Sequence, residues 1–269
     1  MQLRHYLFIF LCVLSFRISA QSTASQQVDN FNMQAIQLST TKKIWVYLPK
    51  DYENSQKAYS VIYMHDAQNL FDAKTSYVGE WEVDEYLDSI CKNEAIVIGV
   101  EHGNEKRIDE LTPYKNANYG GGKGDAYLDF IINTIKPHVD STYRTITDAK
   151  HTTIFGSSLG GLISFYAIIR HPDIFGNAGI FSPSFWINPE IYPLVEMTDI
   201  PKSSRFYFAI GSEEGDEDMV PDQEKMVALL KRKGVKPENI VNKIIIGGKH
   251  NETFWSDYFP EAYQWLVKN

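Results

Sequence analysis

The chain has 269 residues, with 26 Lys and Arg residues against 34 Asp and Glu residues, and a formal net charge of −8. Its length suits one domain, and a hydrophobic content of 43% is enough to build a sizeable core. The acidic balance argues against nucleic acid or an anionic membrane surface as a partner.

The first twenty residues have the pattern of a secretory signal peptide. Basic residues precede the apolar stretch 7–16, and small residues lead to Ala20 and a polar segment. The apolar stretch is too short to span a bilayer, so we expect cleavage after Ala20 and a periplasmic or secreted protein with no further membrane contact. Cleavage removes two arginines and no acid, which makes the formal charge −10, and leaves Cys91 as the only cysteine, so no intramolecular disulfide can form.

The remaining pattern predicts one α/β domain. Polar residues 21–33 are expected to form a flexible lead-in, and residues 34–269 the domain itself. Two antiparallel strands are predicted first, at 35–39 and 43–48. Buried strands and helices then alternate, which predicts a mostly parallel central sheet with helices on both faces, a three-layer sandwich. The predicted strands are 59–64, 95–100, 152–155, 177–181, 205–210 and 239–246, and the predicted helices are 81–90, 127–139, 159–170, 219–233 and 254–268.

A Gly-x-Ser-x-Gly motif lies between a predicted strand and a predicted helix, with Ser158 at its centre. In an α/β-hydrolase fold this arrangement is the nucleophile elbow. The turn is so tight that a β-carbon on either flanking glycine would clash with its surroundings. The alternative is a plain turn in which the serine only caps the helix. The strand before and the helix after the motif favour the nucleophile.

A serine nucleophile needs a base, and chain order selects His250. In this fold the order is serine, acid, histidine. The other histidines precede Ser158 or, in the case of His171, lie on the helix directly after it. His250 follows the last predicted strand, where a loop suits a base that reaches toward the serine. The alternative is an ordinary surface-loop histidine.

The acid is expected after the strand 205–210, where several acidic residues crowd together. We predict Glu214, with Glu213 and Asp216 as alternatives. Only one carboxylate can orient the imidazole, so the others belong to a solvated acidic loop. The role of the acid is to fix the tautomer of the histidine and to stabilise the imidazolium.

An oxyanion hole requires two backbone N–H donors. One is expected at Leu159, directly after the nucleophile. The other is expected in the loop after the strand 59–64, from Ala67 or Gln68. The neighbouring polar side chains of that loop are expected to form stabilising hydrogen bonds rather than to take part in catalysis.

Several motifs together resemble the Putative esterase family of α/β-hydrolases, which includes esterase D, the enterochelin esterases and the feruloyl and acetyl-xylan esterases. They lie at residues 65–72, 79–85, 120–124, 156–161, 182–186 and 248–252, so that the resemblance runs over most of 35–268. It implies an α/β-hydrolase fold, with Ser158 as nucleophile and His250 as base, and it leaves the acid open. Ala67 stands where many relatives have glycine.

We therefore expect a serine carboxylic-ester hydrolase that works through an acyl-enzyme, without a metal or organic cofactor. The substrate is a small-molecule or glycan-linked ester: a siderophore ester, or a feruloyl or acetyl ester of a polysaccharide. Trp186 could line the acyl pocket or belong to the core, and Arg107 could hold an anionic group or be a surface arginine. Two alternatives remain, an acyltransferase with the same three residues and a non-catalytic siderophore- or glycan-binding module. The sequence does not fix the oligomeric state.

Overall fold

The structure is a computed structural model that describes residues 22–90, 94–215 and 219–268. The predicted signal peptide, 1–20, and the alternative acid Asp216 lie outside the described residues. In the described part of the chain, no helix has both the length and the apolar character needed to cross a bilayer.

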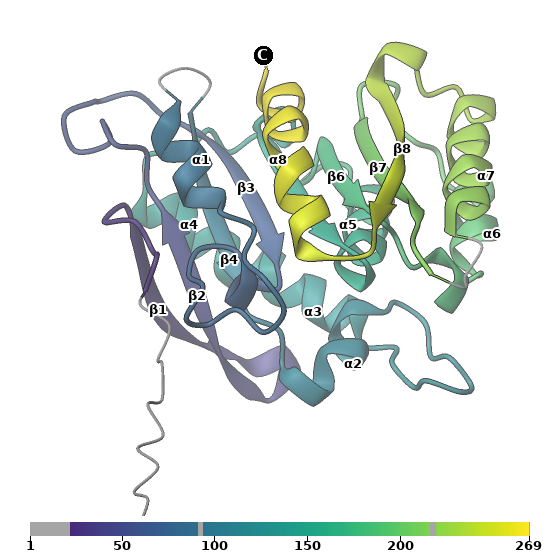
Figure 1. Cartoon of the computed structure of the whole chain (residues 1–269), viewed down its shortest axis with the longest axis horizontal. Coiled ribbons are helices and arrows are strands. Elements are labelled where there is room, and N and C mark those ends of the chain that lie inside the picture. The colour runs from purple at the N-terminus through teal and green to yellow at the C-terminus, as the bar shows by residue number, and fades with distance from the viewer. Residues whose placement is uncertain (1–21, 91–93, 216–218, 269) are drawn as a thin grey trace, which may run out of the picture.

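All strands belong to one eight-stranded sheet (Figure 1). Its spatial order is β1-β2-β4-β3-β5-β6-β7-β8. The pairs β1–β2 and β2–β4 are antiparallel, and all later neighbours are parallel. The strands are β1 (Val28–Ala35), β2 (Thr40–Tyr47), β3 (Ser60–His65), β4 (Ala95–Val100), β5 (Thr152–Ser157), β6 (Asn177–Phe181), β7 (Arg205–Glu213) and β8 (Ile240–Lys249).

Helices cover both faces of this sheet. They are α1 (Val83–Ser89), α2 (Arg107–Leu111), α3 (Gly124–Phe130), α4 (Lys136–Thr142), α5 (Leu159–Arg170), α6 (Ile191–Met197), α7 (Met219–Arg232) and α8 (Glu252–Val267). A π-helical turn, Ile131–Ile135, joins α3 to α4. Neither α2 nor α6 has a counterpart among the predicted helices.

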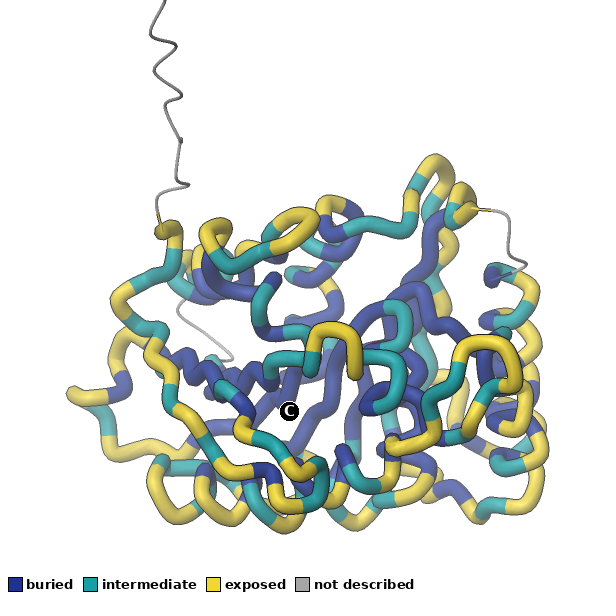
Figure 2. Tube along the Cα trace, turned by 90° about the horizontal axis from the view of Figure 1, so that it is seen from below, coloured by how far each residue is buried: buried dark blue, intermediate teal, exposed yellow. Residues whose placement is uncertain are grey.

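The sheet separates two hydrophobic clusters. Every residue of β3, β4 and β5 is buried, as expected for parallel strands covered on both sides. Because side chains alternate along a strand, Val61 and Tyr63 pack with α3 to α7, while Ile62 and Met64 pack with α1 and α8. Figure 2 shows buried segments through the middle of the molecule and exposed segments around it. The predicted fold, a three-layer α/β sandwich with an antiparallel start, is confirmed.

The strand predicted at 35–39 is wrong, because Ile36–Leu38 form a 3₁₀ turn between β1 and β2. The prediction that 21–33 form a flexible lead-in is wrong for residues 28–33. These residues lie in β1, where Phe31 pairs with Ile44 and Met33 with Lys42 of β2. The strand is at the edge of the sheet, half of its side chains are polar, and all but that of Ala35 are partly or fully exposed. An edge strand is stabilised by backbone pairing to one neighbour, so its composition need not be apolar.

Candidate active site

Ser158 occupies a strained turn between β5 and α5. Its backbone angles are φ 57° and ψ −122°, a region that residues with a side chain rarely adopt. The backbone N–H of Ser158 donates to the carbonyl oxygen of Phe181 on the next strand, at 2.9 Å. A β-carbon on Gly156 would come within 2.8 Å of the backbone of Gly160, and one on Gly161 within 2.7 Å of the Phe181 oxygen. The turn therefore requires glycine at positions 156 and 161. The clash predicted for Gly160, the second glycine of the motif, is wrong, because a β-carbon there would meet no atom closer than 3.4 Å.

His250 and Glu214 are in direct contact. Nδ1 of His250 lies 2.6 Å from Oε2 of Glu214, whose side chain is 2% exposed. The other carboxylate oxygen, Oε1, accepts hydrogen bonds from the Ser182 hydroxyl at 2.8 Å and from the Gly211 N–H at 2.7 Å. The Trp255 indole N–H in turn donates to Ser182 Oγ at 3.0 Å. The carboxylate is thus held on both oxygens, in a geometry that fixes the ring of His250.

Of the two candidate acids that the structure describes, Glu213 and Glu214, Glu214 is the one that contacts His250. The side chain of Glu213 is exposed on the last residue of β7. Asp216 lies outside the described residues. Glu214 therefore lies where the sequence analysis expects the carboxylate that orients the imidazole of His250.

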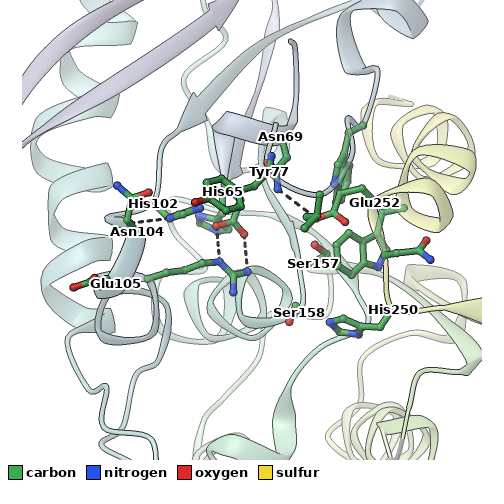
Figure 3. A pocket seen from close by; sticks show the side chains of 16 residues that line it. His65, Asn69, Tyr77, His102, Asn104, Glu105, Ser157, Ser158, His250 and Glu252 are labelled. Atoms are coloured by element: carbon green, nitrogen blue, oxygen red, sulfur yellow. Dashed lines mark hydrogen bonds and ion pairs between the residues drawn. The ribbon is translucent and has the colours of Figure 1, made fainter. Parts of the chain in front are cut away.

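Ser158 and His250 line one cavity of about 690 Å³ at the carboxyl end of the parallel strands (Figure 3). The Ser158 hydroxyl also lies 3.3 Å from the hydroxyl of Ser184. Aromatic walls come from Trp81 and Trp255, and the rings of His250 and Trp255 meet edge to face at 5.0 Å. The arrangement combines a serine on an elbow, a histidine held by a carboxylate, and room for a substrate.

The predicted oxyanion donors lie at the same edge of the sheet. Leu159 is the first residue of α5, so its N–H has no partner one turn earlier in the helix. Ala67 and Gln68 form a 3₁₀ turn, Ala67–Asn69, after β3, the strand next to β5. The side chain of Gln68 exchanges two hydrogen bonds with the backbone of His102, which fixes this loop.

Arg107 lines the cavity, but its charge is already paired. Its Nε and Nη2 donate to the two carboxylate oxygens of Asp66 at 2.7 and 2.8 Å. Burial alone would raise the pKa of Asp66, but the guanidinium of Arg107 outweighs burial and holds that pKa below its ordinary value. Asp66 therefore neutralises the positive charge that Arg107 would otherwise use to bind an anionic group.

Trp186 is not among the residues that line this cavity. It is partly buried, meets the ring of Tyr119 at 5.5 Å and packs against the hydrophobic cluster on the α5 face. The structure therefore places the two predicted substrate-binding residues apart, with Arg107 on the cavity wall and Trp186 elsewhere.

Sequence reasoning assigned no role to Ser182, Ser184 and Glu252. Glu252 is 7% exposed, lines the cavity and accepts a hydrogen bond from Asn69 at 3.3 Å. Burial raises the pKa of its carboxyl. Only their positions in the sequence could have pointed to these residues. Ser182 and Ser184 follow β6, and Glu252 stands two residues after His250.

His65 is a buried histidine behind the elbow. It is 2% exposed, its Nδ1 lies 2.8 Å from the Tyr127 hydroxyl, and a β-carbon on Gly156 would come within 2.9 Å of its ring. Burial lowers its pKa from 6.5 to about 4. It is therefore neutral near pH 7, and its hydrogen bond connects the end of β3 to α3.

One cluster among the described residues could hold a metal ion. Glu80, Asp84 and Glu85 have carboxylate oxygens that lie within 4.8 Å of one another. Only Trp81 of this region, and neither Asp84 nor the two glutamates, belongs to the cavity wall. The cluster is thus separate from the serine and histidine.

A model of the family described as "Putative esterase" matches residues 37–266. The uncharacterized protein YbbA of Bacillus subtilis (strain 168) is 28% identical over 241 residues, 84% of this chain and 92% of that protein. An endo-1,4-beta-xylanase/feruloyl esterase of Xylanibacter ruminicola is 24% identical over 83% of this chain and 29% of that protein. The enterobactin esterase FES from Shigella flexneri shares the fold with a TM-score of 0.72 at 14% identity, covering 90% of this chain and 59% of that chain. Because the family model spans most of the sequence, this chain belongs to the Putative esterase family.

Proposed function

We propose that this protein is a serine carboxylic-ester hydrolase in which Ser158, His250 and Glu214 act together. The observation that carries the proposal is the 2.6 Å contact between a buried Glu214 carboxylate and Nδ1 of His250, which lines the same cavity as Ser158. A serine hydroxyl is a weak nucleophile and needs such a base. Family membership supports ester hydrolysis as the reaction.

In the proposed reaction, the oxygen of Ser158 attacks the ester carbonyl and its proton passes to Nε2 of His250. Glu214 keeps the proton of His250 on Nδ1 and stabilises the imidazolium. The N–H groups of Leu159 and of Ala67 or Gln68 stabilise the oxyanion. His250 then protonates the departing alcohol, and water activated by the same histidine releases the acid from the acyl-enzyme. The reaction uses no metal or organic cofactor.

As substrate we propose a siderophore ester or a feruloyl or acetyl ester of a polysaccharide. The names of two relatives support these classes, one a feruloyl esterase and the other an enterobactin esterase. The cavity of about 690 Å³ has the size of sites that take drug-sized molecules. We further propose export of the protein, to the periplasm or medium, on the strength of its N-terminal pattern.

The test is hydrolysis of p-nitrophenyl acetate, methyl ferulate and a siderophore trilactone by wild type, Ser158→Ala and His250→Ala. We expect turnover by wild type only, with the circular dichroism spectrum unchanged in both variants. Full activity in either variant would remove that residue from the scheme. An acyltransferase would give transesterified product when a sugar acceptor is added, and a binding module would retain ligand without turnover.

A further inference from the structure

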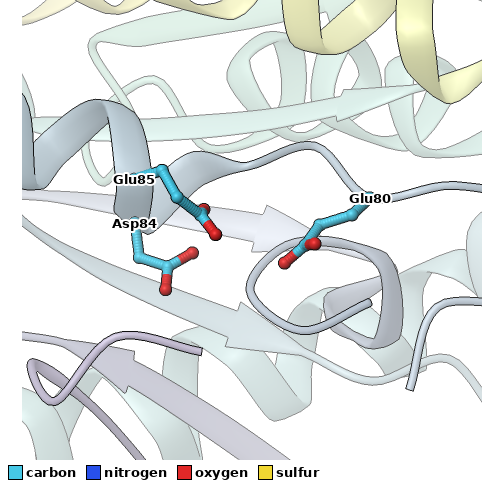
Figure 4. Close-up of side chains that lie close together, drawn as sticks. All are labelled: Glu80, Asp84 and Glu85. Carbon is cyan, nitrogen blue, oxygen red and sulfur yellow. The ribbon is translucent and has the colours of Figure 1, made fainter. Parts of the chain in front are cut away.

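Three carboxylates converge beside the start of α1. Glu80 precedes this helix, and Asp84 and Glu85 lie in its first turn. One oxygen from each lies within 4.8 Å of the others. Figure 4 shows the side chains of Asp84 and Glu85 on the helix and that of Glu80 opposite them. The burial of the three differs, since Asp84 is buried, Glu80 is half-buried and Glu85 is exposed.

Asp84 leaves a buried oxygen without a partner. The residue is 0% exposed, and its Oδ2 accepts a hydrogen bond from the Ser25 N–H at 2.7 Å. Among the described residues no N–H or O–H group donates to its Oδ1, and the neighbouring side chain of Glu85 is another carboxylate, as Figure 4 shows. A buried acceptor without a donor destabilises the fold, and a charged one does so more strongly.

The protein does not supply the missing positive charge from the described residues. None of the ion pairs formed within 22–90, 94–215 and 219–268 includes Glu80, Asp84 or Glu85. The hydrogen-bond donors that reach the cluster are neutral: the Thr23 hydroxyl donates to both oxygens of Glu80, at 3.0 and 2.9 Å. A bound cation would satisfy the free oxygen of Asp84 and neutralise the cluster.

We propose that Glu80, Asp84 and Glu85 bind a calcium ion. All three ligands are carboxylates, which suit a hard cation, and there is no histidine or cysteine in the cluster to favour zinc. Oxygens on opposite sides of Ca²⁺ are about 4.6–5.2 Å apart, so carboxylate oxygens that lie within 4.8 Å of one another can all reach one Ca²⁺ ion. Because Glu85 is exposed, water can complete the six to eight ligands that Ca²⁺ takes.

The calcium ion would fix segment 80–85, which lies between the start of the described chain and the cavity. On one side, Thr23 and Ser25 attach the start of the described chain to Glu80 and Asp84. On the other side, Trp81 follows Glu80 directly and contributes its ring to the cavity wall. The role is structural, because the serine and histidine lie on other elements, so the main effect of Ca²⁺ is on stability.

The experiment measures thermal unfolding of EDTA-treated, dialysed full-length protein with CaCl₂, with MgCl₂ and without added salt. Extracellular calcium modules bind with Kd of about 0.1–1 mM, so the CaCl₂ concentration is set about tenfold above that range. We expect Ca²⁺ to raise Tm by about 3–6 °C and Mg²⁺ to raise it less. Isothermal titration with CaCl₂ should give one site. No Tm increase with CaCl₂ would overturn the proposal.

Two substitutions give the matched comparison. Asp84→Asn keeps the shape of the side chain and should abolish the Ca²⁺-dependent increase in Tm. Glu82→Gln changes an exposed carboxylate next to the cluster and should keep the wild-type increase. If Asp84→Asn does not fold, Glu85→Gln, at the exposed ligand, should lower the increase in its place. An unchanged Ca²⁺ response in the folded ligand variant would also overturn the proposal.

Discussion

Nδ1 of His250 lies 2.6 Å from Oε2 of Glu214, and this contact joins the ends of two neighbouring parallel strands, since Glu214 follows β7 and His250 follows β8. Ser158 follows β5, and Ser182, which donates to Glu214, follows β6. Neighbouring parallel strands end at one edge of the sheet, so residues far apart in sequence meet there. The proposed chemistry uses that edge.

Replacing Glu214 by glutamine should lower kcat by about a hundred- to ten-thousandfold, because the amide no longer stabilises the imidazolium and can select the wrong tautomer of His250. KM should change little, since Glu214 does not line the cavity. The measurement is steady-state hydrolysis of p-nitrophenyl acetate. Glu213→Gln, the same change at the exposed neighbour, is the control and should keep wild-type kcat. Equal losses in the two variants would contradict the assignment.

Replacing Trp255 by phenylalanine tests the support behind Glu214. An aromatic ring is kept, although a smaller one, and the indole N–H that donates to Ser182 Oγ is lost. A neutral hydrogen bond contributes about 1 kcal/mol, so we expect kcat to fall about three- to tenfold with the fold intact. This decrease in kcat should disappear when Glu214→Gln is already present. An additive loss in the double variant would show that Trp255 does not act through Ser182 and Glu214.

Trp186→Ala tests the sequence-based prediction that Trp186 binds substrate. The ring packs against Tyr119, away from the cavity lining. We therefore expect kcat/KM for p-nitrophenyl esters and methyl ferulate to stay within about twofold of wild type, since no contact with the reacting group is removed. A loss of tenfold or more in kcat/KM, with unchanged Tm, would restore Trp186 to the substrate site.

Asp66→Asn should change the charge preference of the cavity. The substitution removes the partner of Arg107 and leaves its guanidinium free to attract an anionic substrate. Asparagine also tolerates the positive φ of 57° at this position. We expect kcat/KM for p-nitrophenyl hemisuccinate, relative to p-nitrophenyl butyrate, to rise about three- to tenfold at low salt. Asp109→Asn, at an ion pair outside the cavity, is the control, and an unchanged ratio in Asp66→Asn would show that Arg107 does not reach the substrate.

His65 should make the fold sensitive to acid. The pKa of His65 is 6.5 in an ordinary setting and about 4 in the folded protein. Between these pH values the unfolded chain therefore holds a proton on His65 that the folded protein does not. Stability is therefore full above pH 6.5 and falls as the pH drops toward 4, by up to about 3 kcal/mol. Denaturant unfolding at several pH values should show this loss in wild type and a flatter curve in His65→Gln. The same change at the exposed His138 is the comparison, and equal curves for wild type and His65→Gln would refute the account.

The sequence predicts the elements whose local pattern carries the information. The apolar runs of β3 and β4 and the glycines around Ser158 could each be interpreted without their neighbours, because burial on both faces and a tight turn restrict composition. β1 was missed since its stability comes from pairing with β2, a contact that its polar residues do not reveal.

The site, too, was predictable only where the local sequence pattern carries the information. Chain order selected His250, but the choice among adjacent acids depends on how β7 ends against β6 and β8, where Gly211 and Ser182 both meet Glu214. The direction of a side chain in a loop is likewise set by tertiary contacts. Nothing local in the sequence shows that Glu252 faces the cavity or that Trp186 turns away from it.

The central claim is that Ser158 is a nucleophile activated by His250, and covalent labelling tests it most directly. Wild-type protein is treated with a fluorophosphonate probe, and the adduct is located by peptide mass spectrometry. The account predicts one adduct, on Ser158, absent in Ser158→Ala and formed much more slowly in His250→Ala. Ser157→Ala, at the adjacent serine, should label as wild type does. Labelling that persists in Ser158→Ala would contradict the account.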